Sequence, residues 1–184
     1  MRVVADRYGV SIDAVTYVLR KTNIPRRSLK EANHLAFEAK TPSFTIRATR
    51  SSYDKTMDLI GAMLYWAEGY KRDTAGGIDF ANSDPDMALL FFRFLKSRYI
   101  LDQKRLYFSV YYYSDQDIRD ITKFWAGKLR VSSKLFRHSY KKLNPNLQAR
   151  KLPYGVLHIR YNDKKLLRDV LGLIQSFKRR FTLR

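Results

Sequence analysis

A single glutamate follows the most apolar stretch of the chain. Residues 59–67 read LIGAMLYWA, without a charge, and Glu68 and Gly69 come directly after them. The spacing of the apolar side chains predicts a helix over 54–67 that is apolar on nearly all sides and is therefore buried on nearly all sides. A carboxylate at the C-terminal end of such a helix faces the negative end of the helix dipole, at a cost of roughly 0.3–1 kcal/mol, and loses hydration. We therefore expect Glu68 to be paired with a cation, either a basic side chain or a divalent metal.

The residues after Gly69 predict the elements that position this carboxylate. Short runs rich in β-branched and aromatic residues predict strands over 70–73, 78–82, 105–113, 134–142 and 155–162. Apolar stripes with helical spacing predict helices over 86–99, 117–129 and 164–180. The expected order is α-β-β-α-β-α-β-β-α, which places this part of the chain in the α+β class.

Three of the predicted strands share a polar face. The segments 105–113, 134–142 and 155–162 contain no Asp or Glu, whereas an ordinary solvated sheet face would carry acids as well. Arg, Tyr, Ser, His and Asn side chains on such a face are suited to reading base edges in the major groove of DNA. The candidate DNA contacts on this sheet are Arg105, Tyr107, Ser109, Tyr111, Arg137, Ser139, Lys141, His158, Arg160 and Asn162.

The first 40 residues predict a small helical region. A helix over 3–8, a turn at Gly9 and a second helix over 11–21 resemble the resolvase-type helix-turn-helix, although a plain two-helix element is the alternative. Ser11 is the expected N-cap, and Val15 and Val18 are expected to fill the interface between the helices. Residues 28–40 are candidates for a third helix, and residues 41–52 for a linker or an edge strand. The expected DNA contacts are Ser11, Asp13, Thr16, Tyr17 and Arg20, with Arg26 and Arg27 on phosphates.

The charge of the chain is large and unevenly distributed. The 184 residues carry a formal net charge of +19. Residues 1–50 hold 10 basic and 4 acidic side chains, residues 51–103 hold 6 and 8, and residues 104–184 hold 20 and 5. A folded protein this basic most often binds a polyanion, with nucleic acid as the leading candidate. The acidic interruption contains Glu68 and lies between the two basic regions.

Composition excludes several classes of function. Cysteine is absent, which excludes disulfides and thiol nucleophiles, and His34, His138 and His158 lack the paired spacing of a zinc enzyme. No stretch has the length of apolar residues that a membrane span needs, and the N-terminal MRVVADRYGV carries charges where a signal peptide needs an apolar run. We expect a cytoplasmic protein, nucleoid-associated in a bacterium, with no membrane partner.

Residues 61–69, GAMLYWAEG, resemble the LAGLIDADG motif of homing endonucleases. Ala67 and Gly69 match directly, whereas Met63 stands where the family prefers Gly, and Tyr65 and Trp66 replace smaller or acidic residues. The resemblance covers residues 53–184 and implies an α-β-β-α-β-β-α domain whose antiparallel sheet forms a saddle over the major groove. The acid before the final glycine of the motif binds Mg²⁺ at the scissile phosphate in that family. The resemblance therefore implies that Glu68 is the catalytic metal ligand, with Mg²⁺ or Mn²⁺ as the cofactor.

The same resemblance implies a homodimer. In the family two motif helices pack against each other at a two-fold or pseudo-two-fold axis, and this chain contains one motif. Basic side chains such as Lys71, Arg72 and Lys141 are equal candidates for organising water or stabilising charge. The implied dimer interface consists of Gly61, Ala62, Leu64, Tyr65 and Ala67.

Three functions follow in order of preference. The first is a site-specific double-stranded DNA endonuclease with a helix-turn-helix at 1–40, a linker at 41–52 and a LAGLIDADG-like domain at 53–184. The second is a non-catalytic transcriptional regulator that joins the same two parts, and the third is an RNA maturase. Retention of the acid at Glu68 favours cleavage over regulation.

Overall fold

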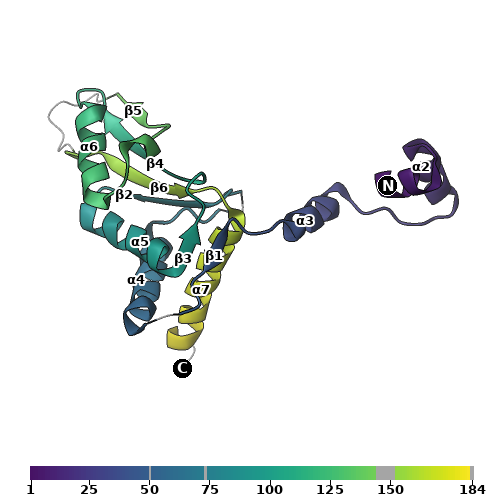
Figure 1. The fold of residues 1–184 in the computed structure, drawn as a ribbon, viewed down its shortest axis with the longest axis horizontal. Coiled ribbons are helices and arrows are strands. Elements are labelled where there is room, and N and C mark those ends of the chain that lie inside the picture. Colours follow the sequence, from purple (N-terminus) through teal and green to yellow (C-terminus); the bar gives the residue numbers. More distant parts are fainter. Residues whose placement is uncertain (50, 73, 144–151, 183–184) are drawn as a thin grey trace. The chain divides into compact units, whose positions relative to one another are not determined.

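The computed structural model describes residues 1–184 except 50, 73, 144–151 and 183–184 (Figure 1). The fold is α+β, which confirms the predicted class, and the described residues form seven α-helices and two sheets. The chain divides into two compact units, Met1–Thr41 and Pro42–Arg184. Within the described part of the chain, no helix combines the length and the apolar character needed to cross a membrane.

The smaller unit consists of three short helices, α1 (Arg2–Tyr8), α2 (Ile12–Lys21) and α3 (Leu29–Ala39). Local signals define them: Gly9 adopts the left-handed φ of 61° that ends α1, and the Ser11 hydroxyl accepts a hydrogen bond from the Ala14 amide at 3.1 Å. A capping box between Ser28 and Glu31 starts α3. All residues of this unit are described, and Ala5 is the only one that is buried. Its helices are therefore encoded locally, without a core of their own.

A four-stranded sheet forms the centre of the larger unit. The strands are β2 (Ile78–Asn82), β4 (Leu106–Tyr113), β5 (Tyr140–Lys142) and β6 (Val156–Tyr161), in the spatial order β2-β6-β4-β5. β6 pairs antiparallel with both β2 and β4, whereas β5 pairs parallel with β4. The sheet is thus mixed, which corrects the expectation of a purely antiparallel sheet.

The parallel pairing follows from the chain path between α6 (Ile118–Leu129) and β5. Arg130 adopts a left-handed conformation after α6, and a 3₁₀ turn, η1 (Ser133–Leu135), replaces the first part of the strand predicted over 134–142. Phe136 then stacks on Phe108 with ring centroids 5.2 Å apart and forms a parallel bridge with it. Burial of Phe136 against β4 therefore sets the chain direction that β5 continues.

Helices α4 (Ser52–Glu68), α5 (Pro85–Arg98) and α7 (Lys164–Thr182) pack on one side of the sheet (Figure 1). Alternate strand residues face these helices and are fully buried, because successive strand side chains point to opposite faces. The central ones are Phe80, Phe108, Val110, Leu157 and Ile159. The opposite face of the sheet carries the polar residues of the same strands.

A second, two-stranded sheet begins inside residues 41–52, the segment expected as a linker or an edge strand, and bears out the second alternative for Phe44–Ile46. β1 (Phe44–Ile46) pairs antiparallel with β3 (Tyr99–Leu101), and Phe44 packs edge-on against Tyr99 at 5.4 Å between ring centroids. Ser43 is fastened as well: its hydroxyl and amide donate to the Asp163 carboxylate at 2.6 and 2.8 Å. Residues 42–46 therefore belong to the larger unit, which starts at Pro42 rather than at residue 53.

Candidate nucleic-acid interface and helix-end carboxylate

Glu68 is the last residue of α4 and is exposed. Lys71 closes this helix end, because its Nζ donates to the carbonyl oxygens of Trp66 and Gly69, each at 2.8 Å. Gly69 has an extended φ of −79°, and a Cβ there would lie 2.5 Å from the ring of Tyr65. Glycine is thus required by close packing rather than by a left-handed turn. Since the carboxylate of Glu68 is exposed, the desolvation cost expected from the sequence does not arise, and its need for a cation is weaker than predicted.

The surroundings of Glu68 are compatible with one ligand of a magnesium ion. Among the described residues, no three His, Asp or Glu side chains gather closely enough to hold a metal. Mg²⁺ keeps several waters and is commonly bound by one or two carboxylates together with phosphate oxygens. Glu68, exposed and without a hydrogen bond or ion pair among the interactions found for the described residues, fits the part of one such carboxylate. The remaining ligands would come from water, phosphate or a second copy of the chain.

Three of the five residues expected at a dimer interface face the core of their own chain. Ala62 and Tyr65 are fully buried, and a Cβ on Gly61 would lie 2.0 Å from the ring of Phe94 in α5. Burial raises the pKa of the Tyr65 hydroxyl well above its ordinary value, and this hydroxyl donates to the Tyr70 carbonyl at 2.8 Å. The small residues thus allow α5, not a second chain, to approach α4, which corrects this part of the expectation.

The outer face of α4 retains an accessible apolar stripe. Leu64 is half-buried and Ala67 is exposed, while Ile60 and Met63 are half-buried beside them. These four residues follow the spacing i, i+3, i+4 and i+7, which places them on one face of the helix. The stripe ends at Glu68.

The three basic side chains proposed to assist catalysis are differently placed. Lys71 is engaged as the cap of α4, and the guanidinium of Arg72 lies 5.9 Å from the centroid of the Tyr70 ring. Lys141 lies on the edge strand β5, where it is exposed. Lys71 therefore has a structural task, which the sequence did not reveal.

The segment after Gly69 connects α4 to the sheet. Tyr70 donates its amide hydrogen to the Asp79 carbonyl at 2.9 Å, and Gly69 forms an isolated antiparallel bridge with Phe80. The described residues 70–72 of the strand predicted over 70–73 form no strand, a single bridge forms at Gly69 instead, and residue 73 lies outside the described residues. Glu68 is consequently one residue away from an antiparallel contact with β2.

The polar face of the sheet is arranged in cross-strand rows. Asp79, Arg160 and Tyr107 are neighbours on β2, β6 and β4, and His158 lies beside Ser109 in the next row. The Tyr111 and His158 rings lie 4.2 Å apart, and Tyr140 follows Tyr111 at 5.5 Å. Tyr, His and Arg side chains from neighbouring strands therefore lie together on this face.

Asp79 is the residue of this face that sequence reasoning missed. Its carboxylate binds His158 Nδ1 at 2.8 Å and Arg160 Nε at 3.0 Å. The three acid-free strands have this acidic neighbour because β2 pairs with β6, a contact between segments far apart in the sequence. Burial acts to lower the pKa of Arg160, but the Tyr111 hydroxyl and the Asp79 carboxylate outweigh it and raise that pKa. The available signal was the alternation in this strand: Ile78 and Phe80 point into the core, so Asp79 between them points to the polar face.

Of two serines predicted as contacts, Ser109 is buried and Ser139 is half-buried. Ser109 is fully buried, and its hydroxyl has no hydrogen-bond partner among the described residues. Ser139 accepts a hydrogen bond from the Val110 amide at 3.0 Å, so its hydroxyl fastens the chain beside β4. Ser109 and Ser139 are therefore structural residues rather than the contact residues expected from the sequence.

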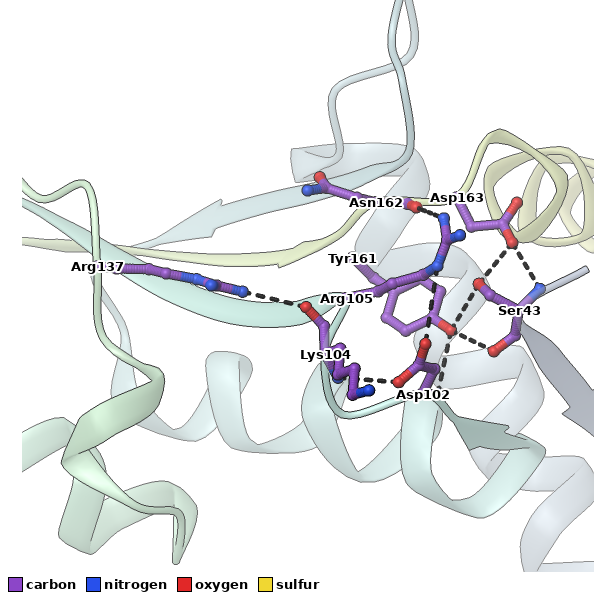
Figure 2. A network of polar contacts seen from close by, with 8 residues as sticks. All are labelled: Ser43, Asp102, Lys104, Arg105, Arg137, Tyr161, Asn162 and Asp163. Atoms are coloured by element: carbon purple, nitrogen blue, oxygen red, sulfur yellow. Dashed lines mark hydrogen bonds and ion pairs between the residues drawn. The ribbon is translucent and has the colours of Figure 1, made fainter.

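Three further predicted sheet contacts, Arg105, Arg137 and Asn162, extend toward one end of β4 and β6 (Figure 2). Arg105 donates to the Asn162 carbonyl at 2.8 Å, and Arg137 donates to the Lys104 carbonyl at 3.3 Å. The guanidinium of Arg137 also lies 4.8 Å from the centroid of the Tyr107 ring. Arg105, Arg137 and Asn162 are all exposed and therefore available to a partner.

The smaller unit presents most of its predicted contacts to solvent. Ser11, Asp13, Arg20, Arg26 and Arg27 are exposed, as is Tyr17, with 64% of its surface accessible. Thr16 is half-buried and donates to the Ile12 carbonyl at 2.9 Å, so it turns toward its own helix. Val18, expected in the helix interface, is 53% exposed, whereas Val15 is half-buried.

Comparison of the chain with protein families, with curated proteins and with solved structures finds no match. The function is therefore argued from the geometry of α4 and the sheet.

Proposed function

We propose that the chain is a site-specific double-stranded DNA endonuclease of the homing-endonuclease type, acting as a homodimer with Mg²⁺ or Mn²⁺. The observation that carries the proposal is the position of Glu68. This exposed carboxylate ends an apolar helix and is joined through Tyr70 to Asp79 at the edge of a basic, aromatic sheet face. A nuclease needs a carboxylate at the edge of its DNA-binding surface, whereas a protein that only adheres to DNA does not.

The order of elements supports the assignment. If the bridge at Gly69 is counted as a first strand, and β3 is set aside because it pairs with β1 in the other sheet, then α4, two strands, α5, β4, β6 and α7 follow the α-β-β-α-β-β-α order of the LAGLIDADG family. In this comparison α6, η1 and β5 form an insertion between β4 and β6. The resemblance of residues 61–69 to the family motif lies at the expected end of α4.

The apolar stripe on α4 supports the dimer. A second copy packed on Ile60, Met63, Leu64 and Ala67 would cover side chains that are now partly exposed, and would bring the two Glu68 carboxylates near one axis. Glu68 of each copy would hold the metal, which supplies an activated water and stabilises charge on the departing oxygen when bound. The polar sheet face would bind and orient the DNA, and the smaller unit would bind a further stretch of it through Tyr17, Arg20, Arg26 and Arg27.

A cleavage experiment tests the proposal. The full chain is used to select its preferred duplex sequence, which is then placed in a plasmid and incubated with Mg²⁺ or Mn²⁺. Wild type and the charge-matched control Asp120→Asn, altered on an exposed residue of α6, should cut it. Glu68→Gln should bind it with similar affinity and leave it intact. A wild type that binds its selected site and never nicks it would exclude the endonuclease.

The regulator is the second candidate, favoured by the separate helical unit at Met1–Thr41. A regulator requires two DNA-binding surfaces and no metal, so Glu68→Gln would be indistinguishable from wild type in every assay. An RNA maturase, the third candidate, would show preference for structured RNA over the selected duplex in a competition experiment.

A further inference from the structure

Asp79 occupies the polar face of the sheet at a position for which the sequence indicates no task. It lies on β2 between the buried residues Ile78 and Phe80, directly across from Arg160 on β6. Tyr107 on β4 flanks Arg160 from the other side. The side chains of Asp79 and Arg160 retain 26% and 20% of their accessible surface, so both are held in the face and still reach solvent.

The hydrogen bonds of Asp79 fix two side chains of β6 at once. Oδ2 accepts from Arg160 Nε at 3.0 Å, and Oδ1 lies 2.8 Å from His158 Nδ1. Because a carboxylate only accepts, His158 carries its proton on Nδ1 at this contact. Arg160 Nη2 lies 3.3 Å from the same Nδ1 and 3.4 Å from the Tyr111 hydroxyl. Nη2 and the protonated Nδ1 are both donors and cannot bond to each other. The hydrogen bond of Nη2 is therefore the one to the Tyr111 hydroxyl.

Within the described part of the chain, three N–H donors of the Arg160 guanidinium have no hydrogen-bond partner. A guanidinium has five N–H donors in a rigid plane, and two of them are taken by Asp79 and Tyr111. The remaining donors are the two hydrogens of Nη1 and one of Nη2, so each Nη atom still offers a donor to a planar ligand with two acceptors. Arg160 and Asp79 also line a shallow hollow of about 240 Å³, whose other lining residues include Tyr70, Gly77, Tyr107 and Asn162.

The charge balance indicates which part of DNA this guanidinium meets. A phosphate at Arg160 would bring a negative charge close to the carboxylate of Asp79, and the two anions would repel each other. A base edge is neutral and avoids that repulsion. Guanine presents the acceptors O6 and N7 side by side in the major groove, the pair that arginine recognises most often.

We propose that Asp79 is a positioning residue that holds Arg160 for bidentate recognition of one guanine in the major groove. This inference rests on the proposed DNA binding, and names part of the sequence that the sheet reads. Asp79 itself does not touch the base. It fixes the plane of the guanidinium and keeps Arg160 away from phosphates.

The test uses the full chain and a randomised duplex library. The bound sequences are determined for wild type, Asp79→Asn and the charge-matched control Asp120→Asn. Wild type and control should select one guanine that Asp79→Asn no longer distinguishes from the other bases, a loss of about 5- to 150-fold in discrimination at that position. Preferences at the other positions should persist. In Asp79→Asn the freed Arg160 can reach a phosphate, so the slope of log affinity against log salt should steepen by about one ion.

The outcomes separate this inference from the proposed function. If wild type selects a sequence and Asp79→Asn selects the same one with the same salt slope, the positioning role is rejected and DNA binding stands. If Asp79→Asn loses all preferences together and melts at lower temperature, Asp79 is structural and the inference also fails. If wild type selects no duplex sequence, the proposed function and the inference are both rejected.

Discussion

The ammonium group of Lys71, three residues after Glu68 in the α4–β2 connection, lies 2.8 Å from the carbonyl oxygen of Trp66. A cation at this position neutralises the negative end of the α4 dipole, where a carboxylate is otherwise disfavoured. Lys71 thus compensates for the placement of Glu68.

Lys71→Met should lower the free energy of unfolding by about 0.3–1 kcal/mol at low ionic strength, and by less at high salt. Lys55→Met, an exposed lysine in the first turn of the same helix, is the control, because a cation there opposes the dipole. Its removal should leave stability unchanged or slightly raised in urea unfolding measurements. Equal losses from the two variants would contradict the capping role.

Gly61 and Gly172 should respond in opposite ways to alanine. A Cβ on Gly61 meets the Phe94 ring at 2.0 Å, whereas a Cβ on Gly172 of α7 meets nothing within 4 Å. Gly61→Ala should therefore destabilise the protein by about 1–3 kcal/mol through overpacking. Gly172→Ala should stabilise it by about 0.5–1 kcal/mol, because alanine favours a helix interior. Denaturant titration of both variants measures the difference, and a neutral Gly61→Ala would contradict the packing of α4 on α5.

Leu64→Asp should abolish self-association. The substitution places a charge in the centre of the accessible α4 stripe, where a second copy would bury it. Sedimentation of wild type should show a dimer at micromolar concentration and the variant a monomer. Leu173→Asp, at another half-buried leucine on α7, is the control for general destabilisation and should remain dimeric. A wild type that is monomeric both free and on its selected DNA would remove the shared-site arrangement.

The Ser43–Asp163 contact should make stability depend on pH. Burial raises the pKa of Asp163, but hydrogen bonds from Ser43 and from the amides of Lys165 and Leu166 outweigh it and hold the pKa below its ordinary value. The stabilisation is therefore present above the unfolded-state pKa of about 3.9 and is lost as the pH falls through the lower folded-state value. Ser43→Ala should cost about 1 kcal/mol at pH 7, and this difference should shrink below pH 3.9.

Urea unfolding at pH 7 and at pH 3 measures this effect. Ser176→Ala is the control, because its exposed hydroxyl donates to the Leu173 carbonyl and has no titrating partner. Its effect should be the same at both pH values. A difference between wild type and Ser43→Ala that grows on acidification would reverse the predicted sign.

Hydrogen exchange should distinguish the two units. The helices of Met1–Thr41 have Ala5 as their only buried residue, so their amides should exchange with little protection. The amides of α5 and β6, which lie in the core, should exchange through global unfolding. Addition of the selected duplex should slow exchange in α2, and unchanged exchange there would remove α2 from the DNA-binding surface.

Local signals in the sequence predict most of the elements and some of the site. The cap at Ser11, the turn at Gly9 and the alternation in β6 depend on neighbouring residues, and each is found as predicted. The partner of Gly61 could not be predicted, because a small residue permits close approach without stating what approaches. Asp79 was missed for a related reason: its side chain acquires a role only when β2 pairs with β6.

The pairing of short or irregular segments could not be predicted from the sequence either. β1 and β3 have three residues each, which is too short for a periodic pattern, and their pairing depends on Phe44 meeting Tyr99. The parallel direction of β5 depends on where Phe136 is buried, not on the basic residues of the strand itself. Thr16 has the exposed position of a DNA contact in the helical pattern, yet its hydroxyl hydrogen-bonds to the helix backbone.

The position of β6 has a consequence for how the protein is made. This strand lies between β2 and β4 and pairs with both, yet it is the last strand of the described chain to be synthesised. Until β6 emerges from the ribosome, β2 and the aromatic strand β4 lack their antiparallel partner. Unpaired strand edges promote association between chains. Closure of the sheet is therefore a late step with high contact order. Yields of folded protein should therefore depend on a low concentration of nascent chains more than on the stability of the finished fold.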